Sequence, residues 1–87
     1  MKPQPIRVQR VQTGVRVEKR MLKVLKSLAE YLDMTLGDLI EGIVLHSFEG
    51  KAPFADDTLT KIEQLKRIYG MDYGIEASHR MTEDSNE

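Results

Sequence analysis

The spacing of the apolar residues changes once along this chain, and that change is the strongest constraint on its fold. Apolar and polar residues alternate from Val11 to Val17, as they do in a strand with one buried face. After Val17 the apolar residues are three and four positions apart, which is the period of a helix with one buried side. We therefore predict a mainly α-helical fold that begins with one short strand. A rival interpretation places a hairpin turn at Thr13-Gly14, because glycine tolerates positive φ.

Three segments have the helical spacing. The first is predicted from Glu18 to Leu32, and the second opens at Thr35, a residue suited to helix capping. The second ends near Glu49-Gly50, because glycine suits the position just past a helix. The third is predicted from about Thr58 to Tyr69.

The remaining regions have weaker patterns. Residues 1–10 include Pro3 and Pro5 and keep no lasting period, which predicts a flexible basic arm. Residues 51–70 are predicted to form a loop followed by the third helix. Residues 71–87 lose the apolar period and become acidic, so we predict a tail that is disordered or ordered only by a partner.

Charge is distributed very unevenly along the chain. Among residues 1–26 there are eight basic side chains and one acidic side chain, a net charge of +7. The rest of the chain has five basic and thirteen acidic side chains, a net charge of −8. The total of −1 therefore conceals a basic first third, which favours a polyanionic partner.

Several function classes find no support in the sequence. The chain has no cysteine, and its two histidines, His46 and His79, are too far apart in sequence for a metal-ligand spacing. It has no glycine-rich phosphate loop and no nucleophile elbow. No stretch has the length and composition of a membrane span. We therefore expect a non-enzymatic protein without a cofactor or metal, located in the cytoplasm and associated with the nucleoid.

The basic segment has residue types that read DNA. On a strand, Gln12, Gly14 and Arg16 project to the same side, and arginine can bond guanine while glutamine bonds adenine. Flanking basic residues are candidates for phosphate contacts, namely Arg10, Lys19, Arg20 and Lys23. The alternative is a solvated basic face with no role in nucleic-acid binding. Because a chain of 87 residues with few elements buries little surface, we also expect an obligate homodimer.

The segment from Gln12 to Phe48 resembles the ribbon-helix-helix family of the Arc and MetJ type. The resemblance extends without a gap and covers somewhat under half of the chain. Residues identical to those of the family are Gln12, Arg16, Leu22, Ala29, Glu30, Ile40, Val44, Ser47 and Phe48. The apolar rhythm also matches at Val15, Met21, Val24, Leu25, Leu28 and Leu36.

The resemblance implies a ribbon-helix-helix fold over residues 11–50, in an intertwined homodimer whose paired strands form a two-stranded antiparallel ribbon. The family reads bases from positions that correspond here to Gln12, Gly14 and Arg16. It holds phosphates at the start of the second helix, which corresponds to Thr35, Leu36 and Gly37. The chain departs from the pattern at Gly14, which has no side chain to read with.

The function expected from these features is that of a homodimeric, sequence-specific transcriptional regulator, a repressor type of protein that reads double-stranded DNA. One alternative is an antitoxin whose C-terminal region binds a toxin. Another is a ribbon-helix-helix dimerisation module without DNA binding. The third helix is expected either to pack back on the dimer or to bind such a protein partner.

Overall fold

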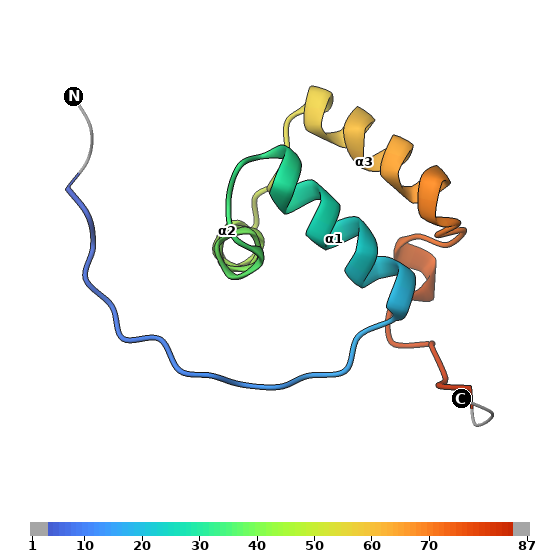
Figure 1. Ribbon diagram of the computed structural model, residues 1–87, viewed down its shortest axis with the longest axis horizontal. Helices are drawn as coiled ribbons and strands as arrows, with labels where there is room; N and C mark the ends of the chain where they lie inside the picture. Colours follow the sequence, from blue (N-terminus) through green and yellow to red (C-terminus); the bar gives the residue numbers. More distant parts are fainter. Residues whose placement is uncertain (1–3, 85–87) are drawn as a thin grey trace.

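The computed structural model describes residues 4–84, and its regular structure is helical (Figure 1). Helix α1 is Lys19–Tyr31, α2 is Leu36–Phe48 and α3 is Asp56–Tyr69. A short 3-10 helix, η1, follows at Ile75–Ala77. The three α-helices agree with the helical segments predicted from the apolar period.

Local chemistry explains where the helices begin and end. The Glu18 carboxylate caps α1 by accepting hydrogen bonds from the backbone N–H groups of Arg20 and Met21. The Thr35 hydroxyl caps α2 by accepting from the Asp38 N–H at 3.0 Å. Gly50 follows the end of α2 and Gly70 follows α3, both with a positive φ near 70° that glycine adopts without steric cost.

Helix α1 is the centre of the packing. It contacts both α2 and α3, which do not pack on each other within residues 4–84. In Figure 1, α1 and α3 run side by side while α2 is seen along its axis. The buried core consists of five apolar side chains, most of them on α1: Val24, Leu28, Ala29, Leu39 and Leu65. The core is small for a chain of this length, and several large apolar side chains are left on the surface.

The predicted strand is wrong, and with it the ribbon-helix-helix fold built on a two-stranded ribbon. Residues 4–18 form an extended segment that curves past α2 in Figure 1, and the structure assigns no strand within residues 4–84. A strand requires a neighbouring backbone to complete its hydrogen-bond ladder, and none lies beside this segment. Val11 and Val15 are 78% and 80% exposed, so the alternation does not mark a buried face here.

The C-terminal part of the chain packs on α1. Leu65 of α3 lies in the core, and Ile62, Tyr69 and Met71 pack around it. Residues 71–84, the described part of the predicted acidic tail, follow α3 and include η1. The rest of that tail, residues 85–87, and the first three residues of the predicted arm lie outside the described residues. Among residues 4–84 no helix has the length and apolar composition needed to cross a membrane.

Leu28 is the most deeply buried large side chain, at 2% exposure, so we expect its truncation to destabilise the fold strongly. Leu28→Ala should lower the free energy of unfolding by about 2–4 kcal/mol, because it removes buried methyl groups and leaves a cavity. Urea denaturation followed by circular dichroism measures this loss. Ile68→Ala, at an exposed position of α3, is the control and should change stability by less than about 0.5 kcal/mol. Similar losses in the two variants would contradict this core.

Candidate nucleic-acid interface

The basic side chains among residues 4–26 lie on an extended segment and on the first turns of α1. We call residues 4–17 the basic arm; every one of its side chains is exposed. Lys19 and Lys23 of α1 are also exposed, whereas Arg20 is half-buried. An open, extended, positively charged segment can approach a polyanion without any rearrangement of the core.

The three predicted base-reading residues lie together on this arm. Gln12 is exposed, and it makes no side-chain hydrogen bond within residues 4–84. Gly14 faces open space, since a side chain built there meets no atom within 4 Å. Arg16 is paired: its guanidinium donates through Nε and Nη2 to the two carboxylate oxygens of Glu83, the first at 3.2 Å. Of the three, Gln12 and Arg16 present groups that could bond a base edge.

Arg10 ties the middle of the basic arm to α2. Its Nε and Nη2 atoms donate to the two carboxylate oxygens of Glu41 at 2.8 and 2.7 Å. This hydrogen bonding raises the pKa of Arg10 and lowers the pKa of Glu41. The contact holds Arg10 beside the middle of α2.

The predicted phosphate site at the start of α2 has one feature against it. Thr35 and Gly37 are exposed and Leu36 is half-buried, and the first backbone N–H groups of a helix have no partner within the helix. The Thr35 hydroxyl already satisfies the N–H of Asp38. Asp38 itself brings a negative charge into the first turn. That carboxylate repels a phosphate, which weakens the case for an anion site at this end.

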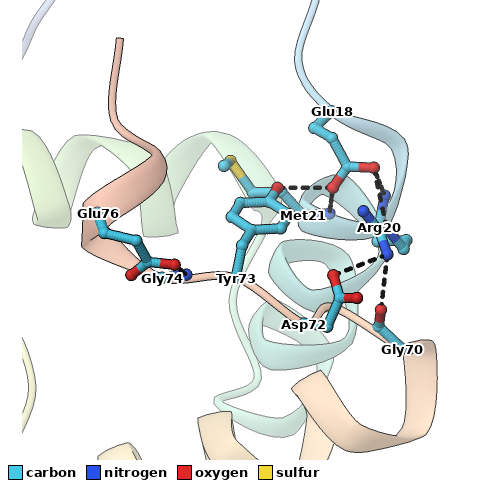
Figure 2. A network of polar contacts seen from close by, with 8 residues as sticks. All are labelled: Glu18, Arg20, Met21, Gly70, Asp72, Tyr73, Gly74 and Glu76. Carbon is cyan, nitrogen blue, oxygen red and sulfur yellow. Dashed lines mark hydrogen bonds and ion pairs between the residues drawn. The ribbon is translucent and has the colours of Figure 1, made fainter. Parts of the chain in front are cut away.

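The guanidinium of Arg20 is engaged in a network of hydrogen bonds within the chain (Figure 2). Its Nε donates to Glu18 at 3.2 Å, and its Nη1 donates to the Gly70 carbonyl at 2.8 Å and to Asp72 at 3.2 Å. The hydroxyl of Tyr73 donates to Glu18 at 2.6 Å, and the Arg20 guanidinium lies 5.6 Å from the Tyr73 ring centre. These contacts fasten the chain that follows α3 to the first turn of α1.

The network fixes the charge of Glu18. Partial burial by itself raises the pKa of this carboxyl, but the hydrogen bonds from Tyr73, Arg20 and Met21 outweigh it and lower the pKa to about 2. Burial of Tyr73 and the hydrogen bond between its hydroxyl and Glu18 raise the pKa of Tyr73 to about 12. Glu18 is therefore a carboxylate and Tyr73 a neutral donor over the whole physiological range.

The exposed lysines of α1 are the remaining predicted phosphate contacts. The Lys23 ammonium lies 5.9 Å from the centre of the Tyr69 ring, a cation–π contact that leaves the charge accessible. Lys19 is exposed at the first position of α1. Within residues 4–84 no three His, Asp or Glu side chains are grouped so that they could hold a metal ion.

Sequence reasoning did not identify the partners of the arginines. Glu18 is the only acid among residues 1–26 and stands directly before a helical period, which could have indicated a cap. Tyr73, Glu41 and Glu83 gave no comparable signal, because each lies far along the chain from its partner. Such pairs follow from the tertiary fold alone.

No family model, curated protein or solved structure matches this chain in the three comparisons that we made.

Neutralising Glu18 should weaken the fold in a pH-dependent way. Glu18→Gln should lower the free energy of unfolding at pH 7 by about 1–2 kcal/mol, because hydrogen bonds to a charged group are lost. The wild-type advantage is complete above pH 4.5 and is lost as the pH falls toward about 2, where Glu18 protonates in the folded state. Urea titrations at several pH values from 7 to about 2.5 measure the narrowing gap. Glu63→Gln is the control, and a gap for Glu18→Gln that stays constant with pH would contradict this assignment.

Proposed function

We propose that this chain is a DNA-binding protein that acts as a homodimer, and that the basic arm is its reading element. The observation that carries the proposal is the separation of charge: residues 1–26 have a net charge of +7, and the described part of that segment leads into α1 as an open, exposed arm. Contacts between such an arm and phosphates release counterions, which drives binding at low salt. A cytoplasmic, nucleoid-associated location and a role in transcriptional regulation belong to the same proposal.

The side chains of the arm suit both parts of DNA recognition. Arg16 carries a forked pair of donors that matches the O6 and N7 acceptors of guanine, and Gln12 can bond N6 and N7 of adenine. Arg10, Lys19 and Lys23 supply charge for phosphates on either side of these residues. Because the described chain has no ribbon, we assign readout to these individual side chains of the arm. Gly14 contributes no side chain, so the expected sequence preference is narrow.

An exposed apolar stripe on α2 supports the homodimer. Ile40, Val44 and Phe48 follow one another at four-residue intervals, so they lie on one side of the helix, and Leu45 adjoins them. Phe48 is 80% exposed and Leu45 is 63% exposed. Apolar residues in one stripe gain most from burial against another copy of the same surface, since a two-fold contact pairs each patch with itself. The small core of a single chain leaves this gain important for stability.

The possible protein partner of the C-terminal region stays a prediction. Leu65 is buried in the core and Tyr73 is hydrogen-bonded to Glu18 at the start of α1, so neither side chain is available to a protein partner in this arrangement. We therefore do not extend the proposal to an antitoxin.

Removing Arg16 tests the reading role. Arg16→Ala should weaken binding to a selected DNA site by about 1–3 kcal/mol and should relax the base preference. The measurements are fluorescence anisotropy on the selected site and on random duplex, after selection of bound sequences from a random pool. Lys51→Ala removes the same charge from an exposed position after α2 and should have little effect. Equal losses on both DNAs would reassign Arg16 to phosphate contact, and absence of wild-type binding at low salt would refute DNA binding.

A charge in the α2 stripe tests the dimer. Val44→Asp should raise the dimer dissociation constant by about 10–100-fold. In a two-fold interface each protomer would bury one unpaired carboxylate, and the loss of hydration of both carboxylates opposes association. Sedimentation or light scattering over a concentration series measures the shift. Ile68→Asp places the same charge on the exposed side of α3 and serves as the control. A wild-type protein that stays monomeric at high concentration would contradict the proposed homodimer.

A further inference from the structure

The chain that follows α3 returns to the point where the basic arm joins α1. Tyr73 is hydrogen-bonded to Glu18, and Glu83 forms an ion pair with Arg16, two residues earlier in the arm (Figure 2 shows the first of these contacts). We propose that residues 70–84, which we call the C-terminal strap, are a tethered acidic competitor that occupies the arm in the free protein and that duplex DNA displaces. The inference rests on the DNA-binding function proposed above and adds a mode of regulation to it.

Glu83 of the strap occupies guanidinium donors of Arg16 that would otherwise bind a guanine, because its carboxylate offers a similar pair of acceptors. A carboxylate offers two acceptor oxygens side by side, and the Nε and Nη2 donors of Arg16 engage both oxygens of Glu83. The O6 and N7 atoms of guanine offer the same pair of acceptors to an arginine fork. The Nε–Nη2 edge cannot serve both at once, so Glu83 excludes a guanine from that edge of Arg16.

The network at Glu18 makes this competition intramolecular. The hydrogen bond from Tyr73 to Glu18 and the bonds from Arg20 to Gly70 and Asp72 fix the first part of the strap beside the root of the arm. Glu83 follows ten residues after Tyr73, a short tether. A group on a short flexible tether acts at an effective concentration in the millimolar range. The tether therefore raises the occupancy of this weak contact above that of a free carboxylate at the same protein concentration.

The charges of the strap agree with this role. Residues 71–84 hold four acidic side chains and one basic side chain, a net charge of −3. Not all of these acids face the arm: Glu76 accepts a hydrogen bond from the Gly74 N–H at 2.8 Å and closes a local turn (Figure 2). On α2, Glu41 holds Arg10 in the same two-pronged way. Two of the arm's arginines are thus neutralised inside the chain.

The contact between Arg16 and Glu83 is highly exposed, and exposed ion pairs are weak and screened by salt. The strap is therefore a moderate brake, which a phosphate array can displace. We expect Glu83→Gln to raise affinity for duplex DNA by about 2–5-fold at low salt, with a smaller gain at higher salt. Glu41→Gln should act in the same direction through Arg10.

The test uses the full-length chain and fluorescence anisotropy on a labelled duplex pool of random sequence. Glu49→Gln removes the same charge from the end of α2 and is the matched control, expected to leave affinity close to that of the wild type. Circular dichroism at the same protein concentration confirms that each variant is folded.

A double-mutant cycle separates the strap from general electrostatics. In an Arg16→Ala background, Glu83→Gln should give no gain, because the group that it frees is absent. Tyr73→Phe releases the anchor and should raise affinity by a factor similar to that of Glu83→Gln, and combining the two should add little.

The possible outcomes distinguish this inference from the function on which it rests. DNA binding that Glu83→Gln leaves unchanged, or raises no more than Glu49→Gln does, overturns the strap alone. An undiminished gain in the Arg16→Ala background also overturns it. If neither the wild type nor the Glu83→Gln and Glu41→Gln variants bind duplex at low salt, the proposed function fails and the strap fails with it. Binding by Glu83→Gln that clearly exceeds wild-type binding supports both.

Discussion

The carboxylate of Glu18 is the contact on which the arrangement of this chain depends. It caps α1, accepts the Tyr73 hydroxyl and pairs with Arg20, so one side chain joins the end of the arm, the central helix and the strap. A single charged group can do this because several donors converge on it and offset the cost of its partial burial. Without it, α1 would lose its cap and the strap would lose its nearest anchor.

Ion pairs also hold the basic arm against the acidic remainder of the chain. Opposite charges on one chain attract, and the structure shows where that attraction is satisfied: Arg10 at Glu41 and Arg16 at Glu83. Both pairs are exposed, so their combined stabilisation is small and sensitive to salt. The arm is therefore held against α2 and the strap by weak ion pairs, which a polyanion can displace if it binds several basic groups of the arm more tightly than these single carboxylates do. Phosphates and base edges meet that condition, since they engage several basic groups at once and release counterions.

The helices could be predicted from the sequence, whereas the extended, unpaired conformation of residues 4–18 could not. Thr35, Gly50 and Gly70 mark helix ends through local chemistry, and the structure agrees. Alternation around Val15 predicted a strand and was misleading, because a ladder needs a neighbouring backbone that local sequence does not specify. The site residues stay predictions: Gln12 and Lys23 are exposed, while Arg20 is engaged in contacts within the chain. Its partners, Gly70 and Asp72, lie about fifty positions away, and no periodicity reveals such a pairing.

In the proposed complex with DNA, the exposure that makes the arm available also limits how specifically it could read a base sequence. Specific readout needs donors held in a fixed geometry, and Gly14 gives the backbone of the arm freedom between Gln12 and Arg16, the two residues proposed to read bases. Ordering that backbone on DNA costs conformational entropy, which reduces affinity for any site. A homodimer offsets this cost because two arms bind with one loss of overall freedom, so the second contact is effectively intramolecular. In the proposed homodimer the exposed stripe on α2 and the weakly held arm therefore depend on each other: a single arm would bind DNA mainly through charge and would discriminate little between sequences.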